Sequence, residues 1–514
     1  MSLKAKASRP PLRDLETDVC VVGSGAGGAV MAKELAEGGL RVVVLEKGGR
    51  FTKRDFTQKE EEMFPRLYED AGLRATQDQS VIILHAQGVG GTTLVNDNIC
   101  FRTPDFVLEH WKARGIEHIA PPQMVPYFEK VEKTIGVCEI QAEEVSRNDQ
   151  LFYRGAAKLG LQPKRFSHNR KDCIGCGFCY CGCAYDRKQN MALTYLPQAE
   201  VAGAMILDHT EAEEIGRNTN RVTHITASRK DPRTGCIKEK LRIRQKCLII
   251  AGGGISTPIL LLKNGFGRLN PNVGRHLSLH PILASLGVMA EEVRFYEGIP
   301  QCVYTDRIVA SEMAGFVLEG IGAHPVLTSL VLNTFGEGHR ERMRDFNRLT
   351  VHYVMVMDRP QGRIRVGPKG QISITYRFHP RDQQSLREGM KLSAQVYFAA
   401  GARKVYLNHV DAPVLEDKSQ IEAIDRLRME PNRILLYSAH QIASCRMGTD
   451  PKHSVTDSFG KFHGMENLFI SDASLFPTSL GYNPQVTIMA LATRNAEYIL
   501  NSSVVSKTVG FGVT

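Results

Sequence analysis

Three glycines near the amino terminus have a spacing that suits the binding of a dinucleotide. Gly23, Gly25 and Gly28 follow the apolar run Val-Cys-Val-Val and precede a helical pattern. In a G-x-G-x-x-G turn the first glycine permits a sharp turn, the second lets the backbone approach a pyrophosphate, and the third lets the helix pack closely on the strand. The pyrophosphate would lie beside Ala26, at the helix start, where free N–H groups favour negative charge. Glu46 ends the next apolar run, 18 residues after Gly28, where a carboxylate can bind a ribose. The pattern therefore predicts a dinucleotide site, without separating NAD from FAD.

A second group of residues with chemical potential is a run of cysteines. Five of the twelve cysteines lie between residues 173 and 183. Cys173, Cys176, Cys179 and Cys183 have the C-x₂-C-x₂-C-x₃-C spacing of a bacterial ferredoxin loop, with Ala184 where ferredoxins place proline. Three interpretations stay open: an iron–sulfur cluster, zinc or another structural metal, and thiols or disulfides packed near the cofactor.

The elements that must position these residues can be read from the hydrophobic pattern. Residues 17–50 read as a strand, a helix and a second strand, and residues 246–250 read as a buried strand that runs into the glycines 252–254. Residues 350–358, 363–366 and 371–377 look like antiparallel strands, and residues 382–400 look like a helix.

Length and composition indicate an ordinary globular protein. The chain has 514 residues, of which 42% are hydrophobic, and a net charge of +10. No long Lys/Arg run or aromatic platform stands out, so nucleic-acid binding is not expected. No run of 18 apolar residues predicts a transmembrane helix, and the start of the chain has no signal-peptide core. These features predict a cytoplasmic protein, although export with a signal-bearing partner stays open.

Several further segments give the chain a family resemblance. They are 90–96 (Gly-Gly-Thr-Thr-Leu-Val-Asn), 248–262, 272–281, 440–448, 467–479 and 481–487. Together with the glycine turn, they resemble the glucose–methanol–choline (GMC) flavoprotein oxidoreductases, in the family's order and over nearly the whole chain. The resemblance implies an α/β fold: a Rossmann-like FAD-binding domain plus an α+β substrate domain with an antiparallel sheet. The expected FAD-binding domain is discontinuous (15–105, 185–285 and 435–514), and the substrate domain takes 106–184, with the cysteine-rich segment 173–183, and 286–434.

The same resemblance implies FAD rather than NAD as the cofactor. Some relatives attach the flavin covalently through a histidine at the position of Val95, so non-covalent FAD is expected here. The residues expected to bind FAD are Gly23, Gly25, Ala26, Gly28, Glu46, Gly90, Gly91, Thr92, Asn96, Gly252, Asp472, Ala473 and Asn483.

The matching positions also imply a catalytic pair. His440 corresponds to the family's base, which takes the proton of the substrate hydroxyl, and Asn483 to the partner that holds the oxygen for hydride transfer. His280 and His463 are interpreted as structural. The sequence thus predicts an FAD-dependent alcohol dehydrogenase or oxidase that acts on CH–OH donors, with a small-molecule alcohol as substrate.

The electron acceptor depends on the cysteines. An iron–sulfur cluster would pass single electrons to a redox partner, such as a cytochrome or a small subunit; without one, oxygen is a plausible acceptor. The alternatives in function are a flavoprotein lyase on the same fold and an NAD-dependent dehydrogenase.

Overall fold

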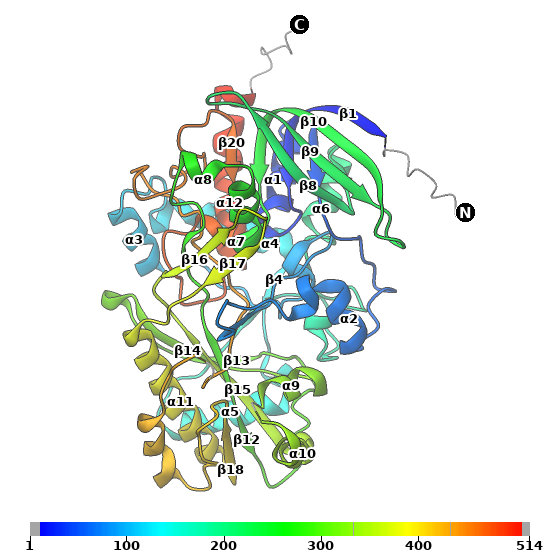
Figure 1. The fold of residues 1–514 in the computed structure, drawn as a ribbon. Coiled ribbons are helices and arrows are strands. Elements are labelled where there is room, and N and C mark those ends of the chain that lie inside the picture. The colour runs from blue at the N-terminus through cyan, green and yellow to red at the C-terminus, as the bar shows by residue number, and fades with distance from the viewer. Residues whose placement is uncertain (1–10, 333, 432, 506–514) are drawn as a thin grey trace, which may run out of the picture.

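The computed structural model describes residues 11–332, 334–431 and 433–505. Figure 1 shows two large sheets, one near each end of the molecule, with helices packed on both. The segment 1–10, in which no signal peptide is predicted, lies outside the described residues, as does the end of the range 435–514. Among the described residues, no helix is long and apolar enough to cross a membrane.

The first sheet has the strand order β7-β2-β1-β10-β9-β8, and β20 pairs with β10. β1 pairs in parallel with β2 and β10, whereas β8 and β9 form an antiparallel extension of β10. The strands are β1 (Leu12–Val22), β2 (Val42–Leu45), β7 (Met205–Leu207), β8 (Thr210–Arg217), β9 (Val222–Lys230), β10 (Ile237–Ile250) and β20 (Leu468–Ile470). This sheet confirms the predicted strand–helix–strand unit and the buried strand that runs into glycines.

The second sheet has the order β3-β19-β12-β15-β14-β13-β5, with β18 paired to β12. It is mostly antiparallel; only β3 and β19 pair in parallel. Its strands are β3 (Val81–Ile83), β5 (Lys164–Arg165), β12 (Ile282–Val288), β13 (Val303–Val309), β14 (Ala314–Gly320), β15 (Leu349–Val356), β18 (Lys404–Leu407) and β19 (Leu436–Ser438). β3 and β19 belong to this sheet although the predicted domain limits assign them to the FAD-binding part.

Smaller sheets and the helices complete the fold. β11 (Arg275–Leu277), β16 (Gly362–Val366) and β17 (Ile372–Thr375) form one small sheet, and β4 (Val137–Glu139) and β6 (Ser167–Asn169) form another. The helices are α1 (Ala26–Glu37), α2 (Glu60–Leu67), α3 (Asp105–Ala113), α4 (Pro121–Ile135), α5 (Arg147–Lys158), α6 (Tyr195–Val201), α7 (Gly253–Lys263), α8 (Phe266–Leu269), α9 (Pro325–Val331), α10 (Gly336–Arg344), α11 (Pro380–Ala400) and α12 (Gln485–Leu500). The three antiparallel strands and the helix predicted between residues 350 and 400 are thus confirmed.

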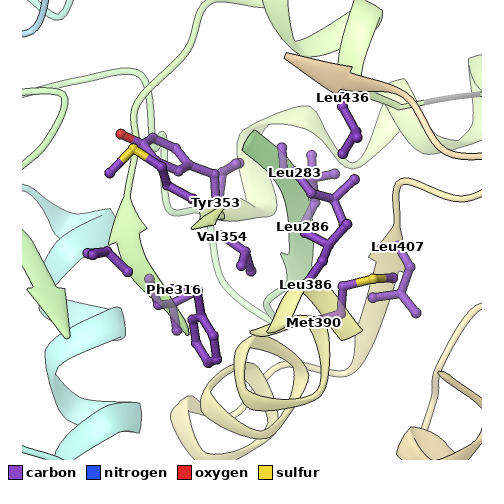
Figure 2. Close-up of a cluster of buried hydrophobic side chains, with 14 of the residues drawn as sticks. Leu283, Leu286, Phe316, Tyr353, Val354, Leu386, Met390, Leu407 and Leu436 are labelled. Atoms are coloured by element: carbon purple, nitrogen blue, oxygen red, sulfur yellow. The ribbon is translucent and has the colours of Figure 1, made fainter. Parts of the chain in front are cut away.

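One face of the second sheet packs on helices and the other remains available for a cavity. Side chains alternate between the two faces of a strand. Figure 2 shows Val354 directed towards α11, beside Leu386 and Met390, with Tyr353 on the other side of β15. α5 covers the same face as α11. Gly320 of β14 lies so close to Asp149 of α5 that a Cβ added at Gly320 would be 1.8 Å from Asp149 Oδ1. The opposite face is therefore the one that can line a site.

Candidate active site

A cavity of about 750 Å³ is lined by residues of both large sheets. At its edge, β1 ends in the glycine turn. Gly23 has a φ of +99°, and a Cβ there would lie 2.4 Å from the carbonyl oxygen of Ala251. A Cβ at Gly28 would lie 1.9 Å from the carbonyl oxygen of Gly23. A Cβ added at Gly25 would have Gly91 Cα as its nearest neighbour, at 3.8 Å, so this part of the backbone is open to a ligand. The three glycines thus have the separate uses that the motif predicts.

Glu46 is held rigidly beside this turn. Its Oε2 accepts hydrogen bonds from the backbone N–H (3.1 Å) and the hydroxyl (2.7 Å) of Ser24, and its Oε1 accepts from the N–H of Gly48 (2.9 Å). The side chain is only 5% exposed but lines the cavity. The N–H of Gly88 also donates to Oε1 at 3.3 Å, so a ribose hydroxyl that binds Glu46 would share or replace that longer hydrogen bond.

Asp472 ties two segments that are distant in the sequence together at the cavity wall. Its Oδ2 accepts from the N–H of Gly253 (2.9 Å) and the hydroxyl of Thr257 (2.5 Å), and its Oδ1 accepts from the N–H of Ser474 (2.8 Å). Burial raises the pKa of Asp472, and these hydrogen bonds oppose that rise. Asp472 thus fixes the start of α7 against the segment that follows β20.

Most of the residues predicted from the sequence surround this one cavity. Gly28 and Gly90 do not line it: Gly28 packs α1 onto β1, and Gly90 accepts the strained φ of +110° before the turn at Gly91. Those that line it are Gly23, Gly25, Ala26, Glu46, Gly91, Thr92, Asn96, Gly252, His440, Asp472, Ala473 and Asn483.

Two amide oxygens in the wall lack a hydrogen-bond partner in the described part of the chain. Asn96 donates through Nδ2 to Gln485 Oε1 (2.8 Å), but its Oδ1 and that of Asn483 are buried without a hydrogen-bond partner among the described residues. Buried polar atoms are usually paired, so unpaired acceptors beside a cavity point to a ligand. The open backbone at Gly25, Glu46 and these amides fit the pyrophosphate, ribose and polar ring edge of FAD. Val95 also lines the cavity and has no group that could bond to a flavin.

His440 lies just after β19, next to a second histidine. The Nδ1 atoms of His440 and His280 are 3.3 Å apart, and His280 Nε2 accepts from the N–H groups of Leu480 (3.2 Å) and Gly481 (3.3 Å). His280 therefore carries its proton on Nδ1 and donates it to His440, whose own proton is then on Nε2. Burial, with His280 nearby, lowers the pKa of His440 well below its usual value, and burial lowers that of His280 to about 3. Both rings are neutral at pH 7.

Several charged and polar residues of the cavity wall carry no local sequence signal. Lys47 and Arg74 both form ion pairs with Glu69, and burial lowers the pKa of Lys47 to about 8. His85 contacts Gln441 (Nδ1 to Oε1, 3.3 Å), and burial lowers the pKa of His85 to about 4. These residues come from segments far apart in the sequence. Only Lys47 could have been predicted from the sequence as part of the site, because it follows Glu46.

The cysteine-rich segment gives the iron–sulfur prediction no support. Cys173, Cys176, Cys179 and Cys183 line one small cavity of about 20 Å³. Nevertheless, in the described part of the chain no three His, Cys, Asp or Glu side chains gather as metal ligands, and the cysteines are all free thiols. The sulfurs are instead used locally: the N–H of Arg187 donates to Cys183 Sγ (3.2 Å) and Asn98 Nδ2 donates to Cys179 Sγ (3.7 Å).

Lys188 links this segment to the main cavity. Its buried Nζ donates to the carbonyl oxygens of Cys179 (2.7 Å) and Leu94 (3.1 Å). The second of these lies in the loop that carries Val95 and Asn96. Of the three interpretations of the cysteines, thiols packed near the cofactor site agree with this arrangement.

A parallel sheet with a glycine turn at a cavity, and an antiparallel sheet on the far side of it, define a flavin-dependent oxidoreductase with a Rossmann-like domain. Sequence comparison agrees: residues 64–282 and 358–492 match the two profiles of the GMC oxidoreductase family, and residues 21–75 match a Rossmann-like NAD(P)-binding domain. The chain belongs to the GMC oxidoreductase family.

Individual relatives span most of the chain. Long-chain-alcohol oxidase FAO3 of Arabidopsis thaliana is 31% identical over 93% of this chain and 67% of its own length. The 6'''-hydroxyparomomycin C oxidase of Streptomyces lividus is 24% identical over 95% of this chain and 92% of its own. Among solved structures, pyridoxine 4-oxidase from Mesorbium loti has a TM-score of 0.72 at 17% identity, covering 94% of this chain and 98% of that one, and therefore shows the fold alone.

Proposed function

We propose that the protein oxidises the CH–OH group of a small-molecule alcohol, with FAD bound non-covalently in the 750 Å³ cavity. The observation that carries the proposal is the presence of His440 and the unpaired Oδ1 of Asn483 in the wall of the same cavity as the glycine turn. Bound FAD supplies the hydride acceptor. The names of the two curated relatives, a long-chain-alcohol oxidase and a 6'''-hydroxyparomomycin C oxidase, support a CH–OH donor.

Asn483 and His440 have different roles toward the substrate hydroxyl group. Asn483 can donate a hydrogen bond from Nδ2 to the substrate oxygen, which holds the carbinol carbon in one orientation and leaves the hydroxyl proton free to face His440. Pro484 follows Asn483 and restricts its backbone away from the helical region. His440 takes up the hydroxyl proton, for which its neutral state at pH 7 is required.

His280 influences which nitrogen of His440 carries the proton, and therefore whether His440 can act as a base. In the resting geometry His440 carries its proton on Nε2 and meets the substrate oxygen as a hydrogen-bond donor. To accept a proton at Nε2, His440 must carry its own proton on Nδ1, where it would meet the Nδ1–H of His280. Before the base can act, His280 must therefore turn away or shift its proton to Nε2, which breaks the hydrogen bonds from Leu480 and Gly481. His280 is therefore a positioning residue for the base.

We further propose oxygen as the electron acceptor. The relatives named above are oxidases, and the cysteine segment shows no gathered metal ligands in the described residues. Formation of hydrogen peroxide during turnover tests this proposal. A reduced flavin that is stable in air but is reoxidised by a quinone or a cytochrome would contradict it and would favour a redox partner.

The decisive experiment is an anaerobic ultraviolet–visible titration with a panel of alcohols. We expect the purified protein to be yellow, and we expect an alcohol substrate to bleach the flavin bands. A yellow protein that converts an alcohol without bleaching would favour the lyase alternative, and a colourless protein would favour an NAD-dependent dehydrogenase.

A further inference from the structure

The far end of the cavity is apolar except for one polar group of residues. β12 contributes Ile282 and Ala284 to the wall, and β15 contributes Val351. Among these apolar side chains lie Gln301 and Tyr353, which are 3% and 5% exposed. They belong to the face of the second sheet that α11 and α5 leave uncovered.

Gln301 and Tyr353 are both held by a buried acid, Glu319. Glu319 lies opposite Tyr353 in the pairing of β14 with β15. The Tyr353 hydroxyl donates to Glu319 Oε2, and Gln301 Nε2 donates to the same oxygen (3.0 Å) and lies 2.7 Å from the Tyr353 oxygen. The three groups form one network, in which Glu319 fixes the direction of the other two.

Several oxygen atoms at this end of the cavity lack a hydrogen-bond partner. Glu319 Oε1 is buried without a partner, and Gln301 Oε1 makes no hydrogen bond with the described residues. Asp97, also in the cavity wall, has an enclosed Oδ1 without a partner among the described residues. Burial raises the pKa of Glu319 to about 8, against the hydrogen bonds from Tyr353 and Gln301, and that of Asp97 to about 6. No Lys or Arg in the described ranges forms an ion pair with Glu319.

Unpaired polar atoms in an apolar enclosure are unfavourable unless a ligand pairs with them. We propose that this end of the cavity is a subsite for a second hydrogen-bonding group of the alcohol substrate, a hydroxyl or an amino group. Gln301 and Tyr353 would contact that group, and Glu319 would position them. The inference rests on the proposed function, because it assigns the remainder of the substrate whose CH–OH group meets His440.

The test compares alcohols that differ only at the far end. The FAD-loaded enzyme is mixed anaerobically with 1-octanol, 1,8-octanediol and 8-amino-1-octanol, with shorter and longer sets included, and flavin reduction is followed by stopped flow. A site built to hydrogen-bond a substrate group discriminates strongly against analogues that lack it. We expect kcat/KM for the diol or the amino alcohol to exceed that for the matching alkanol by at least ~10-fold.

Variants test which residues are responsible for the preference among these alcohols. Gln301→Leu and Tyr353→Phe should reduce the preference to within ~3-fold, mainly through KM. Glu319→Gln should weaken the amino alcohol more than the diol if the group bound is a cation. Tyr406→Phe is the matched control: the Tyr406 hydroxyl also donates to a carboxylate (Asp345 Oδ2, 2.8 Å), but outside the cavity, and its loss should leave the preference intact.

Two results would overturn the subsite. One is a wild-type enzyme that reduces its flavin equally fast with all three alcohols. The other is a Tyr353→Phe variant that loses activity equally on all three, which would make the network a structural support of the sheet. If no alcohol bleaches the flavin, the proposed function has failed; the subsite is then judged by the flavin absorbance change on binding 8-amino-1-octanol, and an affinity unchanged in Tyr353→Phe would refute it.

Discussion

Replacement of His440 is the most direct test of the proposed chemistry. His440→Ala removes the only imidazole that we place at the hydroxyl group, while Asn483 still holds the oxygen and the glycine turn and Asp472 still bind the cofactor. General acid–base catalysis contributes about 10²- to 10⁴-fold to a rate. Because orientation by Asn483 survives, we expect the lower part of this range: a loss of at least ~10²-fold in the rate of flavin reduction, or roughly 3 kcal/mol in the barrier.

The assay is anaerobic flavin reduction by a substrate alcohol, measured beside the FAD content of each preparation. The pH dependence gives a second readout. Burial lowers the pKa of His440 well below 6.5, so the wild-type ring stays neutral across the neutral range and becomes protonated only in acid. Protonation of His440 should therefore not lower the wild-type kcat/KM between about pH 6 and 8, and kcat/KM should fall in more acidic solution, where the base is protonated.

Control variants separate catalysis from folding. His463 hydrogen-bonds Ser454 (Nε2 to Oγ, 2.8 Å) and does not line the cavity, so His463→Ala should retain both FAD and rate. His280→Ala should retain FAD but lose about 10-fold in rate, because His440 then lacks the partner that orients it. A His440→Ala enzyme that reduces its flavin at the wild-type rate would refute the assignment of the base.

Three further outcomes are expected. Acid precipitation should release all FAD into the supernatant, because Val95 offers no point of attachment; flavin left on the pellet would contradict this. Gly28→Ala places a Cβ 1.9 Å from the carbonyl oxygen of Gly23 and should lower FAD retention and the melting temperature, whereas Gly338→Ala, with nothing within 4 Å, should do neither. The fold raises the pKa of Glu319 from near 4.5 to about 8, so the contribution of Glu319 to stability falls as pH rises through that range. The melting temperature of Glu319→Gln relative to wild type should therefore rise with pH. A constant difference in melting temperature would count against a buried neutral acid.

The cofactor end of the molecule was largely predictable, because its determinants are local. The glycine spacing requires backbone conformations and close approaches that few other residues permit, and the apolar runs around it have the period of a strand and a helix. The predicted elements at 17–50 and 246–254 accordingly appear as β1, α1, β2 and the β10–α7 junction. Asp472 could be named only through the family resemblance, since its partners Gly253 and Thr257 are more than 200 positions away.

The cysteine segment shows that the spacing of cysteines along the sequence does not by itself predict a metal site. A spacing states how far apart residues can lie, but the fold decides where their side chains point. Positive φ values at Gly175, Gly177 and Gly182 wrap this segment around a small cavity, as a cluster loop would require. Its sulfurs, however, accept hydrogen bonds from neighbouring N–H groups and are not gathered as metal ligands within the described ranges.

The network of Gln301, Tyr353 and Glu319 had no signal in the sequence, for a different reason. Glu319 and Tyr353 lie on neighbouring strands and Gln301 lies just before β13, and the register between β14 and β15 brings Glu319 opposite Tyr353. A shift of one residue in that register would turn Glu319 towards α5 and α11. A sequence read without strand pairing therefore cannot predict this part of a substrate pocket, even when the family is known.

His280 shows why a structural residue and a positioning residue need not be alternatives. The sequence alone gives His280 a structural interpretation, and the N–H groups of Leu480 and Gly481 do anchor its Nε2. That same anchoring forces the proton onto Nδ1, where it faces His440. Because the anchor sets the tautomer of both rings, a change that loosens the 480–481 backbone should alter the pH profile of turnover even though it touches neither substrate nor cofactor.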